Sequence, residues 1–329
     1  MSVCLCRPRF VLHTAMNITE EERQGIYGRE SHEENIIFAT FYILVFIIAV
    51  PGNALALWAF CRQASTSPSK VFLKHLAIAD ISYILILPMR VIYHLSDSHW
   101  PFGHILCQLA GFLFYVNMYC SVYLMSFISL DRLLALLLPV KSQLVRKPAY
   151  ASVAAGILWV IVIVSMSPLI LSKKHMTNNS TGTCSQLYLE KPSPTALVST
   201  IVAFVIPLVT IMVSYILILL KLKTVQQNEK RQMKDKAIRM IILIMMNFLF
   251  AIVPYHVTRV IYIHSHSDSH MTMAKSESLA RANRITSALT CVSGVLDPLM
   301  YFFLTNTYRN ILLQLVRRED HHQQSTRIM

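Results

Sequence analysis

Seven apolar runs, each roughly 20 residues or longer, alternate with short polar segments along the chain of 329 residues. At 1.5 Å per residue, a helix of that length crosses the hydrocarbon core of a bilayer, which is about 30 Å thick. The runs lack the alternation at every second position that strands of a membrane barrel require, so they predict helices. The predicted spans are Ile36–Phe60, Val71–Leu95, Ile105–Leu138, Ala151–Leu171, Ala196–Leu220, Ala237–Ile263 and Asn283–Leu304.

This pattern predicts an all-α membrane protein built as a bundle of seven transmembrane helices. An extracellular N-terminal segment covers residues 1–35, the helix domain covers 36–304, and a short amphipathic cytoplasmic helix with a tail covers 305–329. Residues 1–15 contain no sustained apolar stretch, and the first apolar run is longer than the core of a signal peptide. We therefore expect the first helix to direct insertion.

The composition supports the same class. Hydrophobic residues make up 54% of the chain and charged residues only 14%, whereas a soluble domain carries about 25% charged residues. The formal net charge of +13 is compatible with nucleic acid, a membrane surface or an acidic ligand, and the positions of the charges decide among these. Seven cysteines are too few for a scaffold held together by disulfides at this length.

Basic residues predict the orientation, because short cytoplasmic loops are rich in Lys and Arg. The loop after the third span contains Lys141, Arg146 and Lys147, and the loop after the fifth is still more basic, so both are predicted to be cytoplasmic. The N-terminus is then outside, at the plasma membrane. Acceptor sequences for N-glycosylation fall on this outer face, at Asn17, Asn178 and Asn179. The basic residues of the later loop are Lys221, Lys223, Lys230, Arg231, Lys234, Lys236 and Arg239.

Ionisable residues inside the membrane are expensive and usually face the interior of a bundle. Asp80 lies in the middle of the second span and Asp297 deep in the seventh, and Ser121 and Ser293 are expected to complete a polar site with them. Two interpretations stay open and are compatible: a site for a small cation or a proton, and a structural network bridged by water.

Cationic and protonatable side chains recur near the outer ends of the spans. If these helices surround one cavity, the arginines offer paired donors to a phosphate or carboxylate, and nearby aromatic rings suit a planar ring or an acyl chain. The alternative is that Arg90 and Arg284 extend to lipid phosphates while His256 is a hydrogen-bonded core group. The group consists of Arg90, His256, Arg259, Asn283 and Arg284, with Phe114, Tyr115, Asn117 and Tyr119 from the third span.

Cys107, at the outer start of the third span, and Cys184, in the next outer loop, both lie on the oxidising side of the membrane. A bridge between them would hold that loop over the bundle. At the cytoplasmic end of the third span, Asp131 and Arg132 are adjacent opposite charges, and Arg132 is able to reach another helix. Taken alone, this dipeptide equally fits a simple interfacial ion pair.

Together these residues resemble the rhodopsin-like G-protein-coupled receptors over Ile36 to Leu313, because one motif of that family occurs in each helix and in the right order. The resemblance implies roles in switching and G-protein coupling for Asp131, Arg132, Tyr215, Phe248, Pro254, Asp297, Pro298 and Tyr301. The motifs are Gly52-Asn53, Leu76-Ala77-Ile78-Ala79-Asp80, Asp131-Arg132-Leu133, Trp159, Pro207 with Tyr215, Phe248 with Pro254, and Asp297-Pro298-Leu299-Met300-Tyr301.

Within that family the chain resembles the branch for nucleotides and lipid mediators. His256-Val257-Thr258-Arg259 is similar to a motif that nucleotide receptors use against phosphates, and Tyr93-His94 also fits the branch, which adds Tyr93 to the ligand-binding group. The resemblance implies UDP, a UDP-sugar or a cysteinyl leukotriene as an anionic agonist. It also implies heterotrimeric G proteins, mainly of the inhibitory class, and arrestin as partners.

The sequence departs from the family pattern at several points. Leu133 stands where an aromatic residue is usual, and Ile252, two residues before Pro254, replaces the usual Trp or Phe of a rotamer switch. Residues 264–280 contain no Cys, so Cys4 and Cys6 lack the partner for the second disulfide of the branch. The tail after Leu304 has no Cys for a palmitoyl anchor.

Other functional classes find little support. The seventh span has no Lys to hold retinal, no pair of related halves suggests a transporter, and no nucleophile with a base indicates an enzyme. The sequence predicts no catalytic or metal site, no cofactor and no nucleic-acid partner. Two alternatives stay open: a receptor for another lipid mediator such as a lysophospholipid, and a receptor that acts without ligand and modulates neighbouring receptors.

Overall fold

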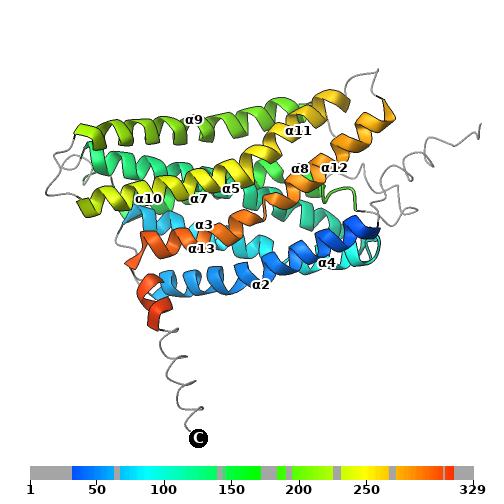
Figure 1. The fold of residues 1–329 in the computed structure, drawn as a ribbon, viewed down its shortest axis with the longest axis horizontal. Helices are drawn as coiled ribbons and strands as arrows, with labels where there is room; N and C mark the ends of the chain where they lie inside the picture. The colour runs from blue at the N-terminus through cyan, green and yellow to red at the C-terminus, as the bar shows by residue number, and fades with distance from the viewer. Residues whose placement is uncertain are drawn as a thin grey trace, which may run out of the picture.

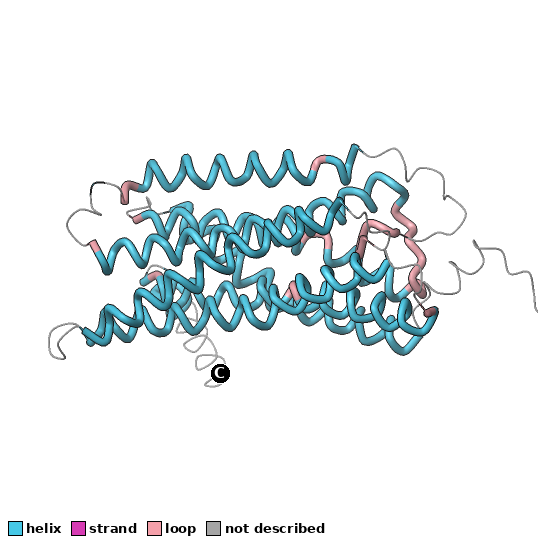
Figure 2. The backbone as a smooth tube through the Cα atoms, turned by 90° about the horizontal axis from the view of Figure 1, so that it is seen from above, coloured by secondary structure: helices cyan, strands magenta, loops and turns pink. Residues whose placement is uncertain are grey.

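The structure is a computed structural model that describes residues 32–62, 67–138, 144, 146–171, 184–189, 195–224, 231–266, 272–306 and 308–314. All regular structure within these residues is helical (Figures 1 and 2). The seven segments long and apolar enough to span a membrane correspond one to one with the predicted spans, which confirms the helical bundle. They are His32–Arg62, Pro68–Leu95, Gly103–Leu137, Pro148–Leu171, Leu197–Leu222, Ile238–His266 and Met273–Leu304.

The first three spans form one side of the bundle around a long central helix. The first is α2 (His32–Arg62), and the second is divided into α3 (Pro68–Ile84) and α4 (Leu87–Leu95), a break that precedes Pro88. The third, α5 (Gly103–Leu137), packs against α3, α9 and α7. Helix α5 is therefore central to the bundle, and residues along it contact several other helices.

Proline also shapes the remaining spans. The fourth is α7 (Pro148–Met166) followed by α8 (Pro168–Leu171), and the fifth is α9 (Thr195–Thr224). The sixth contains α10 (Arg231–Asn247), a π-helical turn η2 (Phe248–Ile252) and α11 (Val253–His266), with Pro254 as the second residue of α11. The seventh contains α12 (Met273–Leu289) and α13 (Val292–Leu304). Because α12 begins ten residues before the predicted span, its first turns are polar.

The interior of the bundle is close-packed, and its outer surface is apolar. A Cβ atom on Gly52 would lie 2.7 Å from Cγ of Pro298, so glycine is what allows α2 to approach α13 this closely. Residues 308–314 are helical after α13, as predicted, and the buried Tyr308 hydroxyl donates to the Gly52 carbonyl at 3.4 Å. Large side chains such as Ile47, Val160 and Leu220 face outward, as they do in helices that contact lipid.

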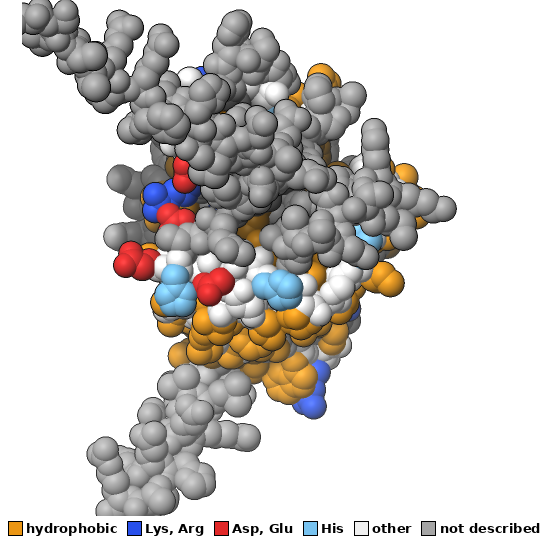
Figure 3. Space-filling view, turned by 90° about the vertical axis from the view of Figure 1, so that its right-hand side faces the viewer, with side chains coloured by type: hydrophobic (Ala, Val, Ile, Leu, Met, Phe, Trp, Pro, Cys, Tyr) orange, Lys and Arg blue, Asp and Glu red, His pale blue; other side chains and the backbone are white. Residues whose placement is uncertain are grey.

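We call the two ends of the bundle the disulfide end, where α5 begins, and the Asp131 end, where α5 finishes. In the view onto the disulfide end, acidic and histidine side chains lie beside a band of hydrophobic side chains (Figure 3). Two contacts at this end, a hydrogen bond between His32 and Asp97 at 2.9 Å and an ion pair between Arg281 and Glu34, join segments far apart in the chain.

Candidate functional site

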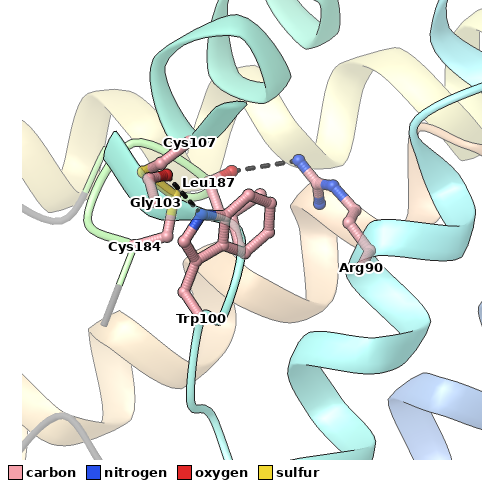
Figure 4. Close-up of a disulfide and its surroundings, with 6 residues drawn as sticks. All are labelled: Arg90, Trp100, Gly103, Cys107, Cys184 and Leu187. Carbon is pink, nitrogen blue, oxygen red and sulfur yellow. Dashed lines mark hydrogen bonds between the residues drawn. A yellow bond between two sulfur atoms is a disulfide. The ribbon is translucent and has the colours of Figure 1, made fainter. Parts of the chain in front are cut away.

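A disulfide joins Cys107 at the start of α5 to Cys184, as the sequence predicts, with the two Cα atoms 5.7 Å apart. Trp100 lies beside it and donates its ring N–H to the Gly103 carbonyl at 2.8 Å (Figure 4). The predicted glycosylation sites Asn17, Asn178 and Asn179, together with Cys4 and Cys6, lie outside the described residues. Of the described cysteines outside the bridge, Cys61 is exposed, whereas Cys120 and Cys291 are buried.

The loop segment that follows Cys184 enters the helix bundle. Leu187 is 0% exposed and Tyr188 1% exposed, so these residues are as buried as the core. The backbone of the loop lies directly on α5, because a Cβ atom on Gly111 would be 2.7 Å from the Gln186 carbonyl oxygen. A loop usually runs over the surface, where water satisfies its peptide groups. Here the peptide carbonyls of residues 187–189 need partners inside the protein.

Arg90 supplies one of those partners. Its guanidinium is fully buried and donates to the Leu187 carbonyl (Figure 4) and to the Tyr42 hydroxyl, both at 3.1 Å. It therefore points into the bundle, away from lipid phosphates. Four aromatic rings surround its Cζ atom at centroid distances of 5.0 to 5.7 Å, an arrangement that favours a cation. These rings belong to Tyr42, Tyr83, Phe114 and Tyr188.

Arg259 supplies the second partner from α11. It is buried and donates to the Leu189 carbonyl at 3.0 Å, with longer contacts to the Tyr188 carbonyl at 3.4 Å and the Asn283 side-chain oxygen at 3.5 Å. Asn283 in turn donates to the Tyr188 carbonyl at 2.9 Å. We call Arg90, Arg259, Asn283 and the carbonyls of residues 187–189 the arginine cluster.

In the part of the chain that the structure describes, the two cations of the arginine cluster have no carboxylate counter-ion. Among the described residues, neither Arg90 nor Arg259 forms an ion pair with a carboxylate. Burying a charge without an opposite charge is costly, and neutral carbonyls and aromatic rings compensate only part of that cost. The cluster therefore favours an anion that brings its own negative charge.

The loop is also held by residues that the prediction of binding residues did not include. His94 accepts or donates through both ring nitrogens, to the Asn35 side chain and to the Tyr188 hydroxyl, each at 2.8 Å. The Tyr42 hydroxyl lies 3.4 Å from that of Tyr188. The adjacent Tyr93, which was predicted, packs edge-on against His94 at 5.1 Å. The pair Tyr93-His94 was a usable signal, whereas nothing in the sequence indicates that Tyr188 folds inward.

A second group of predicted residues lies deeper, between α5 and α11. The hydroxyls of Tyr115 and Tyr255 are 2.9 Å apart, and Phe114 packs edge-on against both rings. Tyr119 contacts His256 at a centroid distance of 6.1 Å. Through Phe114 this group reaches Arg90, so most predicted binding residues form one connected set. Arg284 is buried on α12, near Asn283 in the chain.

One ring nitrogen of His256 is available for a new partner. Its Nδ1 atom lies 3.0 Å from the Ile252 carbonyl, and its Nε2 atom is buried and has no hydrogen-bond partner among the described residues. A buried polar atom without a partner costs free energy that a ligand atom would recover.

The residues of the predicted polar site lie in the middle of the bundle, and their hydrogen-bond partners include side chains that the sequence analysis did not assign to it. Asn117 donates to Asp80 at 3.2 Å, which corrects its placement with the outer aromatic residues. Asn247, which the sequence reasoning missed, donates to Asp297 at 2.7 Å and to Ser293 at 3.2 Å, and Tyr301 donates to Asp80 at 3.4 Å. The Ser121 hydroxyl is buried without a described partner. No cluster of three or more metal-ligating side chains occurs in the described part of the chain.

At the Asp131 end, the acidic side chain is shared between basic residues. Arg146 donates to both Asp131 oxygens, at 2.7 and 3.1 Å, and Arg132 lies 3.3 Å from the same carboxylate. Ser69 of α3 contacts both Asp131 and Arg132. From the sequence, Arg146 indicated only the orientation of the chain in the membrane. These contacts hold α3 and α5 against Arg146, which lies in the segment before α7.

Of the remaining predicted switch residues, Tyr215 and Phe248 are buried, whereas Pro254 and Pro298 are half-buried. The Tyr215 hydroxyl accepts from Ser129 at 2.8 Å, which joins α9 to α5. Phe248 begins the π-helical turn, Pro254 follows it, and Pro298 packs on Gly52. Leu133 and Ile252, the two departures from the family pattern, are both buried.

Comparison with known proteins decides the family. Residues 52–301 match the model of the 7 transmembrane receptor (rhodopsin family). The chain belongs to this family. The receptor is 49% identical to the human uracil nucleotide/cysteinyl leukotriene receptor over 290 residues, which cover 88% of this chain and 79% of the relative.

The mouse counterpart of that relative is 47% identical over 290 residues, covering 88% of this chain and 85% of the relative. The human cysteinyl leukotriene receptor 1 is 30% identical over 288 residues, covering 84% of each protein. The receptor is accordingly a membrane protein with several spans that couples to G proteins and responds to a small-molecule agonist, and it is not an enzyme.

Proposed function

We propose that the receptor binds an anionic extracellular mediator, namely UDP, a UDP-sugar or a cysteinyl leukotriene, and activates G proteins of the inhibitory class. The observation that carries this proposal is the burial of Arg90 and Arg259 without a described carboxylate partner. The names of the relatives, which mention uracil nucleotides and cysteinyl leukotrienes, support the same ligand classes.

The proposed location is the plasma membrane, with the N-terminus and the disulfide end outside. The Cys107–Cys184 bridge supports this orientation, because disulfides persist in oxidising compartments. Basic residues at the opposite end, Arg62, Lys221, Arg239 and Arg309, support a cytoplasmic Asp131 end. That end is the surface on which a G protein, and later arrestin, would dock.

Binding would exchange neutral acceptors for charged ones. A phosphate or carboxylate group takes the positions of the loop carbonyls on Arg90 and Arg259, and a bond between two charged groups is roughly twice as strong as one to a neutral acceptor. Tyr115, His256 and Arg284 contact the rest of the ligand. A ligand that binds more tightly to a contracted disulfide end shifts the population toward that state.

The contraction is transmitted by the sixth span. Pro254 and the π-helical turn before it form the bend about which the cytoplasmic half swings outward. Arg132 then leaves Asp131, and Tyr215 and Tyr301 rearrange around the space that opens. The measurable output is nucleotide exchange on the G protein.

The substitution Arg259→Ala tests the ligand site. We expect the potency of the active mediator to fall about 100-fold, because a buried hydrogen bond to a charged group contributes about 1.5–3 kcal/mol. Suppression of cyclic AMP by UDP, UDP-glucose and leukotriene D4 is measured in cells with equal surface expression. Arg281→Ala, which removes an exposed arginine paired with Glu34, is the matched control. Full potency in Arg259→Ala would contradict the proposal.

A second candidate function is signalling without a ligand. The observation that favours it is that the receptor's own loop already occupies the donors of Arg90 and Arg259. In that case the loop itself stabilises the signalling state. Raised basal G-protein activity in cells depleted of nucleotides and leukotrienes distinguishes this function from the first, and low basal activity excludes it.

A further inference from the structure

One face of α3 changes character along its length. At the Asp131 end of the bundle, Lys70 and Lys74 lie one helical turn apart on this face, and both are half-buried. The face continues with the half-buried Ile78 and Ile81 and ends at the exposed Leu85, directly after α3. Most other side chains of α3 are buried. We call these five residues the α3 stripe, which is cationic over its first turns and apolar after them.

The neighbours of the α3 stripe carry a cation and an aromatic ring each. Helix α3 packs against α2, α5 and α7, so the stripe, its least buried face, points out of the bundle between α2 and α7. Arg62 ends α2, and its Cζ atom lies 4.6 Å from the centroid of the exposed Trp58 ring. Lys147 directly precedes α7, and its Nζ atom lies 5.9 Å from the centroid of the exposed Tyr150 ring. Exposed Trp and Tyr rings are typical of the boundary between membrane and water.

The charges around the α3 stripe are not balanced within the described part of the protein. The stripe and its neighbours contribute four cations, namely Arg62, Lys70, Lys74 and Lys147. None of them pairs with a carboxylate among the described residues. Asp131 lies at the same end, but its carboxylate is buried and already paired with two arginines. Lys and Arg at this level extend their charged groups toward lipid phosphates, so a negatively charged lipid is the natural counter-ion.

We propose that the α3 stripe is a binding site for a phosphoinositide of the cytoplasmic leaflet. The phosphates contact the two lysines, and an acyl chain follows the apolar part of the stripe. A phosphoinositide carries several phosphates on one ring, so it contacts both lysines and a flanking cation together, whereas phosphatidylserine offers a single phosphate. The choice of leaflet rests on the proposed orientation. The contact between stripe and lipid does not, and it lies at the opposite end of the bundle from the arginine cluster.

The position of the stripe gives the lipid a structural consequence. Lys70 directly follows Ser69, whose buried hydroxyl contacts both Asp131 and Arg132. A lipid held on Lys70 therefore binds beside the contacts that join α3 to α5. A ligand that binds the folded protein stabilises it by mass action, so the thermal midpoint of the receptor should rise as the lipid is added.

Direct binding tests the site. Purified full-length receptor in detergent micelles, which have no sides, is titrated with a fluorescent short-chain phosphatidylinositol 4,5-bisphosphate. We expect saturable binding to the wild type. The double variant Lys70→Gln, Lys74→Gln should raise the Kd about 30-fold, because each basic residue near an anionic headgroup accounts for roughly a fivefold change.

Two matched variants separate the stripe from general charge effects. Lys221→Gln, Arg239→Gln removes two exposed cations from α9 and α10 at the same end, and its Kd should stay within about threefold of the wild type. Lys70→Arg, Lys74→Arg keeps both cations on α3 and should also stay within about threefold, since the phosphates need charge at these positions. Unlabelled short-chain phosphatidylserine should displace the probe only at a concentration at least about fivefold higher than the unlabelled phosphoinositide.

Three results would overturn the proposal: no saturable binding to the wild type, equal losses in the two glutamine variants, or equal displacement by both lipids. The last result would reduce the stripe to general attraction between basic residues and acidic lipid. Failure of the anion site has a different signature. In that case Arg259→Ala keeps its response to UDP, UDP-glucose and leukotriene D4, while the phosphoinositide still distinguishes the α3 lysines from those of the control.

Discussion

The arginine cluster and the Asp131 end both bury charge, but they balance it differently. Asp131 accepts hydrogen bonds from Arg146 and contacts Arg132, so positive and negative groups meet within the protein. Arg90 and Arg259 meet only carbonyls, an amide, a hydroxyl and aromatic rings among the described residues. The first arrangement holds helices together by itself, whereas the second is incomplete in electrostatic terms. We infer that the balanced end sets the resting state and that the unbalanced end responds to a ligand.

The largest expected effect comes from unbalancing the Asp131 end. Asp131→Asn leaves Arg146 and Arg132 without their carboxylate. Breaking a fully buried ion pair costs about 3–5 kcal/mol, and the cost here is smaller because both arginines are partly exposed to solvent. The resting state loses that stabilisation, so exchange of GTPγS without ligand should rise. Asp97→Asn, which removes an exposed carboxylate from the pair with His32, is the control. Unchanged basal exchange in Asp131→Asn would show that the pairing does not hold the resting state.

The sequence predicted the bundle because it depends on local patterns, since apolar runs of the right length specify spans whatever their neighbours. It predicted the disulfide because that topology puts both Cys107 and Cys184 on the oxidising side of the membrane. Depth within the bundle is not a local property. Asn117 follows Phe114 and Tyr115 in the chain, yet it donates to Asp80 in the middle of the bundle.

The missed residues have a common cause. Asn247, His94 and Tyr188 act through partners on other segments, and the Tyr188 loop is ordinary in composition. Its burial depends on space created by Gly111, a glycine whose role is visible only when the two backbones are seen together. Contacts between distant segments were therefore the part of the site that the sequence could not supply.

An intermediate effect is expected where the loop meets α5. Gly111→Ala places a methyl group 2.7 Å from the Gln186 carbonyl, so the loop must move, at a typical overpacking cost of about 1–3 kcal/mol. The thermal midpoint of the purified receptor should fall, and the response to the anionic agonist should change with it, because Leu187 and Leu189 shift away from the arginines.

Gly156 offers a matched control for that substitution. It also lies within a helix, and a Cβ atom added there meets nothing within 4 Å. Gly156→Ala should therefore be neutral or stabilise the receptor by about 0.5–1 kcal/mol. Equal midpoints for the two variants would show that the loop backbone is not in tight contact with α5.

The smallest effect is expected at the surface of the disulfide end. Glu34→Gln removes the pair with the exposed Arg281, and pairs at the protein surface contribute about 0–1 kcal/mol because water and salt screen them. The thermal midpoint and the agonist potency should stay within error of the wild type. A large loss of potency would mean that the charge balance of this end extends beyond the two buried arginines.

Saturation binding of labelled ligand to purified receptor tests the role of the buried arginines most directly. The double variant Arg90→Met, Arg259→Met is compared with Arg62→Met, Arg309→Met, which lowers the net charge equally at the opposite end. Labelled UDP, UDP-glucose and leukotriene D4 are the probes. We predict saturable binding of at least one probe to the wild type and to the second variant, and its loss in the first. Equal affinity in both variants, or no saturable binding to the wild type, would contradict an anion site at Arg90 and Arg259.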